Sequence, residues 1–253
     1  MKPAAGRPSS RPSAAAPRHG LARVLSKLGV CSRSQAEAAI RDGRVMVNGR
    51  IERNPERPSD AARDRITVDG QPVAAAAKRY IAINKPRGVV VSAADERGRD
   101  TIYALLSEAG LPWIGPVGRL DKASEGLLLL SNDTVWAAGI TEPAGQLEKT
   151  YHVQVAGLPD AAALAAMEGG IVDQGERLSA RRVSVLRSGE KNCWLEVVLD
   201  EGRNRHIRRL LDALGYDTLR LLRVSIGGLA LGDLAKGAWR DLSADEVTAL
   251  RQL

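Results

Sequence analysis

The chain has 253 residues, of which 26% are charged and 44% are hydrophobic. This composition is typical of a folded protein with one or two domains, and it excludes a collagen-like, mucin-like or wholly disordered chain. No apolar run approaches the ~18 residues that a membrane-spanning helix needs. The first twenty residues lack the apolar core of a secretory signal, and Cys31 and Cys193 have no metal-ligand spacing. We therefore expect a cytoplasmic protein with two free thiols.

The formal net charge of +7 is distributed unevenly along the chain. Residues 1–20 contain four basic and no acidic residues, and residues 21–73 contain ten basic and seven acidic ones. The positive excess therefore lies entirely before residue 74. This pattern indicates an anchor for RNA, DNA or another acidic surface, or else a tail that only increases solubility. Since the chain has no phenylalanine, a sheet that stacks several bases on aromatic rings is not expected.

The first 73 residues predict a disordered tail followed by a small folded unit. Residues 1–20 are rich in Pro, Ala, Ser, Gly and Arg without an apolar period, so we expect them to be disordered. Residues 21–28 carry apolar side chains at helical spacing, and Gly29 supplies the stop signal.

A second helix and two hairpin turns are predicted next. Ser34 and Glu37 match a capping box for a helix over residues 35–41. Two dipeptides between apolar residues predict tight turns, namely Asn48-Gly49 and Asp69-Gly70.

Beyond a linker at residues 74–79, the region 80–253 predicts a larger domain in which strands and helices alternate. The predicted strands are 80–84, 88–92, 127–131, 151–155 and 194–199. The predicted helices are 101–108, 160–167, 206–214 and 243–251. The fold class is therefore α+β: a small helix-hairpin domain followed by a mixed α/β domain.

The unit at residues 21–73 resembles an S4 RNA-binding domain. The residues that carry the resemblance are Leu21-x-x-Val24-Leu25-x-x-Leu28-Gly29-Val30-Cys31-Ser32-Arg33-Ser34-x-Ala36 and Ile40-x-x-Gly43-Arg44-Val45-x-Val47-Asn48-Gly49. In that family, two helices and a hairpin present basic side chains to structured RNA. The candidates here are Arg23, Lys27, Arg33, Arg41 and Arg44. Several of these lie next to predicted helix ends, where phosphate is also favoured by free N–H groups. Taken singly, each arginine is equally explained as a solvated surface charge.

One segment of the larger domain places polar residues directly before an apolar strand. Asp121 lies on a predicted loop that leads into the run Leu127 to Leu130. Burying a carboxylate there costs several kcal/mol unless it is paired. The pattern therefore suits a fixed, poorly solvated carboxylate, although an aspartate that caps a turn would look the same.

The larger domain resembles the pseudouridine synthases, in the ribosomal RNA branch that carries an S4 domain. The matching segments, in chain order, are Asn84-Lys85-Pro86-x-Gly88, Gly118-Arg119-Leu120-Asp121, Glu148-Lys149-Thr150-Tyr151-x-Val153, Glu201-Gly202-Arg203-Asn204-Arg205-His206-Ile207-Arg208-Arg209-Leu210, Arg220-Leu221-x-Arg223-x-x-Ile226-Gly227 and Leu234-x-x-Gly237-x-x-Arg240-x-Leu242. The resemblance spans residues 21–251 and implies a catalytic domain at 80–253 with a central, largely antiparallel sheet.

The resemblance implies an isomerase that converts a uridine of RNA to pseudouridine. The bond between N1 and C1′ breaks, the uracil turns, and C5 joins C1′, so no cofactor or metal is needed. By resemblance, Asp121 is the catalytic carboxylate, Arg208 keeps it ionised, and Tyr151 stacks on the base or relays the C5 proton. A uridine in a helix must leave the stack to reach such a site.

Further basic residues of this domain are candidates for RNA binding: Lys85, Arg119, Arg203, Arg205 and Arg209. Lys85 is also a candidate for shaping the floor of the site. The sequence departs from many relatives at His206, where they have glutamine, and we treat this as a question of fine contacts.

Two alternatives stay open at this point. One is a non-catalytic S4-type RNA-binding factor for ribosome assembly, and the other is a different enzyme, such as a phosphatase or an RNA methyltransferase. The expected partner is ribosomal RNA or a ribosomal subunit precursor, with large-subunit (23S) RNA favoured over 16S RNA. We expect a monomer that does not bind membranes.

Overall fold

The computed structural model describes residues 19–93, 98–141 and 147–251. The chain divides into two compact units, Met1–Ala75 and Ala76–Leu253. Most of the predicted tail at residues 1–20 lies outside the described residues. Among the described helices, none is both long enough and apolar enough to cross a membrane.

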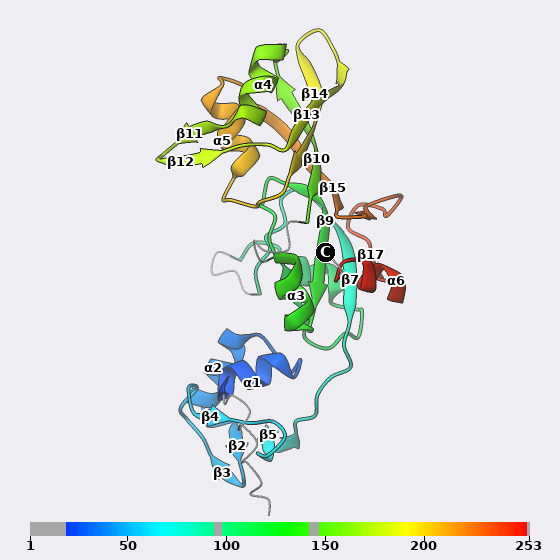
Figure 1. Ribbon diagram of the computed structural model, residues 1–253. Coiled ribbons are helices and arrows are strands. Elements are labelled where there is room, and N and C mark those ends of the chain that lie inside the picture. Colours follow the sequence, from blue (N-terminus) through cyan, green and yellow to red (C-terminus); the bar gives the residue numbers. More distant parts are fainter. Residues whose placement is uncertain (1–18, 94–97, 142–146, 252–253) are drawn as a thin grey trace, which may run out of the picture. The chain divides into compact units, whose positions relative to one another are not determined.

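The first unit packs two helices against a small sheet (Figure 1). Its helices are α1 (Leu21–Lys27) and α2 (Arg33–Arg41). Its strands are β1 (His19–Gly20), β2 (Val45–Val47), β3 (Arg50–Ile51), β4 (Pro58–Ser59), β5 (Ile66–Val68) and β6 (Gln71–Pro72). The sheet has the order β3-β2-β5-β6, and β1 pairs separately with β4. Apolar residues of both helices form one core with Val45, Val47 and Ile66.

Both predicted hairpin turns form, because their central residues adopt the left-handed conformation that such turns need. Asn48 and Gly49 have φ of 54° and 80°, and they join β2 to β3. Asp69 and Gly70 have φ of 48° and 78°, and they join β5 to β6.

The predicted capping box is wrong by two residues. The residue that caps α2 is Ser32, whose side chain accepts from the N–H of Gln35 while the Gln35 side chain accepts from the N–H of Ser32. Ser32 is extended and precedes the helix, as a cap must, whereas Ser34 lies within the first turn. Glu37 is instead bonded to arginines on the helix surface.

The second unit is built on a nine-stranded sheet with the principal order β13-β14-β10-β15-β9-β7-β17, in which β16 pairs with β15 and β8 with β9. Its strands are β7 (Tyr80–Lys85), β8 (Gly115–Val117), β9 (Glu125–Ser131), β10 (Lys149–Ala156), β13 (Arg182–Ser188), β14 (Asn192–Leu199), β15 (Thr218–Ile226), β16 (Leu229–Ala230) and β17 (Trp239–Asp241). The named ladders of this sheet are antiparallel except the one between β9 and β15, which is parallel. The expectation of an α+β fold with a largely antiparallel central sheet is confirmed.

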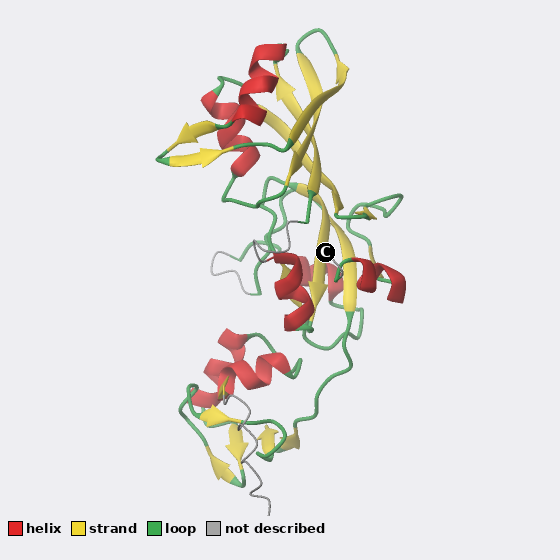
Figure 2. Cartoon of the chain, viewed as in Figure 1, coloured by secondary structure: helices red, strands yellow, loops and turns green. Residues whose placement is uncertain are grey.

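Helices cover this sheet at both ends (Figures 1 and 2). The helices are α3 (Thr134–Thr141), α4 (Ala161–Gly169), α5 (His206–Ala213), α6 (Ala244–Ala249) and the 3₁₀ helix η1 (Ile102–Leu106), and a separate hairpin consists of β11 (Ile171–Asp173) and β12 (Glu176–Leu178). Residues Lys78 and Arg79 of the predicted linker belong to this unit, since Lys78 pairs with Asp133 and Arg79 with Asp241.

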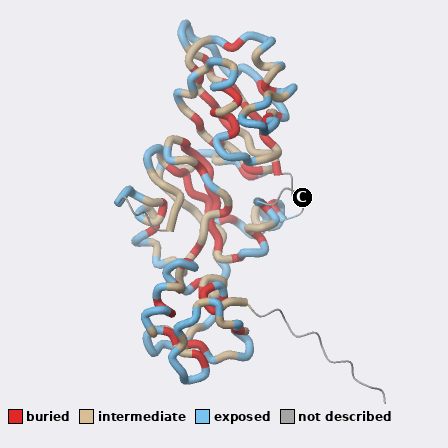
Figure 3. The backbone as a smooth tube through the Cα atoms, turned by 90° about the vertical axis from the view of Figure 1, so that its left-hand side faces the viewer, coloured by how far each residue is buried: buried red, intermediate tan, exposed pale blue. Residues whose placement is uncertain are grey.

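Strand β9 runs through the centre of the unit and explains its four consecutive leucines. Leu128 and Leu130 pack into one core cluster, and Leu127 and Leu129 pack into another on the opposite face. All seven residues of β9 are buried, and Figure 3 shows continuous buried stretches along the central strands. A strand buried on both faces reads as an unbroken apolar run.

Two predicted elements differ in the structure. The segment 88–92 forms only an isolated bridge between Val90 and Thr101, because Gly88 turns the chain with a φ of +95° and donates its N–H to Lys122 O. The helix predicted at 101–108 is the shorter 3₁₀ helix η1.

Candidate active site

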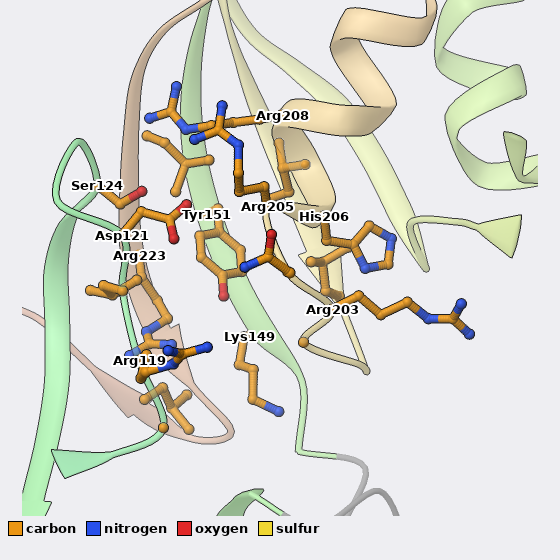
Figure 4. Close-up of a pocket in the computed structure, with 18 of the residues that line it drawn as sticks. Arg119, Asp121, Ser124, Lys149, Tyr151, Arg203, Arg205, His206, Arg208 and Arg223 are labelled. Carbon is orange, nitrogen blue, oxygen red and sulfur yellow. The ribbon is translucent and has the colours of Figure 1, made fainter. Parts of the chain in front are cut away.

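A pocket of about 340 Å³ opens where β9, β10, β15 and α5 meet. It is lined by the loop before β9, by the start of β10, by the loop that precedes α5 and by residues of β15. Figure 4 shows the Asp121 carboxylate pointing into this pocket toward the Tyr151 ring. The structure thus brings Asp121, Tyr151 and Arg208 into one cavity, although they lie on three separate segments of the chain.

The loop that carries Asp121 is held at several points. Gly118 begins it with a φ of +75°, and the N–H of Ser124 donates to Asp121 O at 3.0 Å. Lys85 reaches in from β7 and donates its ammonium to Ser124 O at 2.7 Å. These bonds fix the backbone on either side of the carboxylate, so Asp121 needs little reorganisation to act.

Lys85 is fully buried in this position, and its second bond goes to Pro86 O at 3.0 Å. Burial lowers the pKa of Lys85 to about 8, and the nearby carboxylates Glu125 and Asp121 oppose this effect. Lys85 is not among the residues that line the pocket, and its ammonium is bonded to two backbone carbonyls. Of the two roles expected for Lys85, this placement corresponds to the floor of the site and not to RNA binding.

Gly126 lets β9 approach β15 closely enough to complete the pocket. Its φ is +100°, and a Cβ atom built there would lie 2.3 Å from Arg223 O. Gly126 pairs with Arg223 in the parallel ladder, and Arg223 lines the pocket. The glycine is therefore required for the contact between the strands as well as for the loop.

Arg208 lies in the first turn of α5 and is 9% exposed. Its guanidinium donates to Ala123 O at 3.3 Å and to Thr218 O at 3.4 Å, and its Nε has no hydrogen-bond partner. It attracts the Asp121 charge without forming a direct ion pair: burial and Arg205 lower the pKa of Arg208, while Asp121 raises it. Arg205, just before the helix, has a φ of +49°.

Tyr151 is the first buried residue of β10 and is 8% exposed. Its ring forms the wall of the pocket beside Asp121 (Figure 4). A flat aromatic wall next to a carboxylate is suited to a planar base.

The pocket is strongly positive. Its described lining contains six cationic side chains, Arg119, Lys149, Arg203, Arg205, Arg208 and Arg223, against the single carboxylate of Asp121. Such a surplus attracts a polyanion. Among the predicted RNA-binding residues, Arg119, Arg203 and Arg205 lie in this lining.

Arg209 does not share that position. Its guanidinium bonds Asp173 at 2.5 Å and Glu176 at 2.6 Å, so it fastens the β11–β12 hairpin to α5. Since successive residues of a helix point about 100° apart, Arg208 faces the pocket while Arg209 faces the hairpin. Both acceptors are carboxylates, so Arg209 is ion-paired within the catalytic unit, and its RNA binding stays a prediction.

The five predicted RNA-binding residues of the first unit lie on its surface or at partly buried positions. Three of them are ion-paired: Arg33 with Glu37 and Glu56, Arg41 with Glu37, and Arg44 with Asp69. Arg23 is exposed, and Lys27 Nζ lies 3.1 Å from His19 Nε2.

His206 is buried at the start of α5 and lines the pocket. Its Nδ1 lies 3.6 Å from Glu201 Oε1. Burial lowers the pKa of His206, and Glu201 opposes this. The ring therefore favours its neutral form at neutral pH.

Sequence reasoning assigned no role to Arg223 and Lys149, which both line the pocket. Each belongs to a motif quoted for the family resemblance, so a basic residue within such a motif was the sequence feature that could have indicated a site residue. The contacts that place them could not be seen in the sequence, because they come from the pairing of distant strands.

Comparisons with known proteins agree with this geometry. The family model for RNA pseudouridylate synthase matches residues 79–213, and the S4 domain model matches residues 20–58. The chain belongs to the RNA pseudouridylate synthase family. An uncharacterized RNA pseudouridine synthase of Aquifex aeolicus is 38% identical over 90% of this chain and 92% of its own length. Ribosomal large subunit pseudouridine synthase B of Bacillus subtilis is 34% identical over 92% of this chain and 96% of its own length.

A solved pseudouridylate synthase structure shares this fold, with a TM-score of 0.64 and 29% identity over 92% of this chain and 99% of that one. This pseudouridine synthase therefore combines an S4 domain with a catalytic domain, as expected, and it is an RNA-modifying enzyme.

Proposed function

We propose that this pseudouridine synthase isomerises one uridine of large-subunit ribosomal RNA, with Asp121 as its catalytic carboxylate. The observation that carries the proposal is the single carboxylate inside a strongly cationic pocket, next to an aromatic wall. The similarity to the Bacillus subtilis protein named ribosomal large subunit pseudouridine synthase B supports the choice of RNA.

The reaction places specific demands on such a pocket. Breaking the bond between N1 and C1′ generates positive charge on the sugar, which an ionised carboxylate stabilises or bonds to, as in glycoside chemistry. The uracil then turns, C5 bonds to C1′, the C5 proton leaves and N1 takes up a proton. The reaction balances without a second substrate, so Asp121 does not have to activate a water molecule.

The neighbours of Asp121 have distinct proposed roles. Arg208 and Arg205 place positive charge in the pocket that holds the Asp121 carboxylate. The Arg208 guanidinium is held by backbone carbonyls, so its charge is fixed before RNA arrives. Tyr151 provides a surface on which the detached uracil can stack, and its hydroxyl is our candidate for relaying the C5 proton.

We assign the first unit to RNA anchoring. Its paired arginines, Arg33, Arg41 and Arg44, have side chains that are 55–64% exposed, and exposed ion pairs are worth only about 0–1 kcal/mol. Phosphates can therefore displace the carboxylate partners at little cost. Such contacts position an RNA more than they read its sequence.

The test is a pseudouridine map of ribosomal RNA from cells that lack the protein. The intact chain, the Asp121→Asn variant and the control Asp233→Asn are each returned to these cells. Asp233 is exposed on the loop after β16, so its variant keeps activity. We expect one uridine of the large-subunit RNA to depend on the protein and to be restored by the intact chain and the control only.

Two outcomes contradict the proposal. If Asp121→Asn restores the modification, Asp121 is not the catalytic carboxylate. If no uridine depends on the protein, a non-catalytic role in ribosome assembly gains support. A binding assay separates the roles further, because Asp121→Asn is expected to keep its RNA affinity within a few-fold.

A further inference from the structure

We infer that Arg223 and Lys149 form a phosphate site at one end of the pocket, and that it holds an RNA backbone phosphate next to the target uridine. The inference rests on the proposed function and adds the place where the backbone of the flipped nucleotide is bound. It gives a role to two cations that the proposed chemistry does not use.

Five of the six pocket cations fall into two groups on either side of Asp121 and Tyr151, and Arg203 lies apart from both groups (Figure 4). Arg205 and Arg208 lie on one side, where they serve the carboxylate. Arg119, Lys149 and Arg223 lie on the other side. A nucleotide whose sugar is at Asp121 and whose base is at Tyr151 carries its phosphates to the cations that surround these residues, and the second group is the one that has no role at the carboxylate.

Arg223 is the strongest member of this group. It is 4% exposed, and its Nε donates to Leu127 O at 2.7 Å, which fixes the guanidinium. Its Nη2 is buried and has no hydrogen-bond partner in the described part of the chain. A buried charged donor without a partner is costly. The missing partner is therefore an acceptor that arrives with the ligand.

Lys149 adds a second charge to the same place. It is partly buried, and its ammonium donates to Leu147 O at 2.7 Å. Burial lowers the pKa of Lys149 first, Arg223 lowers it further, and Asp200 opposes both. Two cations in a partly desolvated pocket repel each other, and an anion bound between them removes this repulsion.

Within the described residues, no carboxylate forms an ion pair with Arg223 or Lys149; Asp200 acts on Lys149 only through its charge. Asp121 is the single acidic residue of the lining. Three other acidic residues adjacent in sequence to the lining form ion pairs with other cations: Glu148 with Arg181, Glu125 with Arg220 and Lys236, and Glu201 with Arg203. An arginine fork together with a lysine point charge is suited to phosphate, and phosphate is the anion that an RNA substrate brings.

The first test uses uridine and its 5′- and 3′-monophosphates as probes. Affinities for the full chain are measured by NMR titration. We expect one monophosphate to bind at least about tenfold more tightly than uridine, the value of one charge-assisted contact. That preference is lost in Arg223→Gln and reduced in Lys149→Gln. Arg182→Gln, an exposed arginine of β13 outside the pocket lining, keeps it.

Equal or undetectable binding of the three probes overturns the inference, and so does a preference that persists in both variants. Because Arg223 also bonds Leu127 O, tryptophan fluorescence must show that its variant is folded, and Lys149→Gln carries the test if it is not. Neither readout involves turnover. Failure of the Asp121 assignment therefore leaves this result intact, and the two proposals can fail separately.

A second test uses the mapped RNA and the Asp121→Asn chain, which binds without turnover. A neutral methylphosphonate replaces either phosphate next to the target uridine. We expect one replacement to weaken binding about tenfold and to have no further effect in the Arg223→Gln background. Additive losses from the RNA and protein changes contradict direct contact.

Discussion

Replacing Gly126 by alanine is expected to destabilise the catalytic unit severely. A Cβ atom at this position would lie 2.3 Å from Arg223 O, 2.8 Å from Leu222 Cδ1 and 2.9 Å from Arg223 N. Two of the three atoms are backbone, so no side-chain rotation relieves the contact. Strands β9 and β15 would have to separate where they bring Arg223 to the pocket.

Two costs combine in this variant. The φ of +100° is unfavourable for an L-residue by about 1–2 kcal/mol, and overpacking of a well-packed interior costs about 1–3 kcal/mol. Together they predict a loss of roughly 2–5 kcal/mol in the free energy of unfolding. That is a large part of the ~5–15 kcal/mol typical of a domain.

Denaturant titration followed by tryptophan fluorescence measures this loss selectively. The chain has four tryptophans, and all of them, at positions 113, 136, 194 and 239, belong to the second unit. The matched control is Gly139→Ala, in helix α3, where the new Cβ meets nothing within 4 Å. Alanine should stabilise that helix by about 0.5–1 kcal/mol. A Gly126→Ala variant as stable as the intact chain would refute the reasoning.

Three further predictions concern other parts of the molecule. Burial alone would raise the pKa of Asp133, but hydrogen bonds from Lys78 and Tyr80 outweigh it and lower the pKa to about 2. The stabilisation that ionised Asp133 provides is therefore complete above about pH 4 and is lost as the pH falls toward 2. Asp133→Asn should lower the free energy of unfolding by about 2 kcal/mol at neutral pH. In acid titrations followed by fluorescence, the variant should lose less stability between about pH 4 and pH 2 than the intact chain does. Ser32→Ala should increase hydrogen exchange of the α2 amides by an amount equivalent to about 1 kcal/mol, whereas an equal effect of Ser34→Ala would contradict the observed cap. Deleting residues 1–75 should weaken RNA binding and lower its salt dependence, because most of the net positive charge is removed; an unchanged salt slope in a variant with native fluorescence would argue against the anchor.

Local features were predictable from the sequence because their causes are local. The turn at Asn48-Gly49 needs two residues with positive φ, and Asn and Gly are the residue types that adopt this conformation most readily. The cap of α2 was misplaced because Ser32 and Ser34 are each followed three residues later by a capping partner, Gln35 or Glu37. Only the backbone conformation distinguishes the two.

The candidate site was predictable where motifs carry it and not where distant strands create it. Asp121, Tyr151 and Arg208 were singled out by resemblance, and they share one pocket. Arg223 lies in the pocket because β15 pairs with β9. No local sequence pattern predicts this pairing. Arg209 was predicted to bind RNA because its neighbours are basic, and the sequence did not show that its ion-pair partners Asp173 and Glu176 lie on a hairpin formed earlier in the chain.

The parallel pairing of β9 with β15 also affects how the protein is made. Glu125 and Gly126 pair with Leu222 and Arg223, which the ribosome adds roughly a hundred residues later. At a translation rate of about 5–20 residues per second, the leucine-rich edge of β9 stays unpaired with β15 for some 5–20 s. An unpaired apolar edge is a template for aggregation. The nascent chain therefore completes its pocket only after β15 has been synthesised, and this interval is when we expect chaperone protection to matter most.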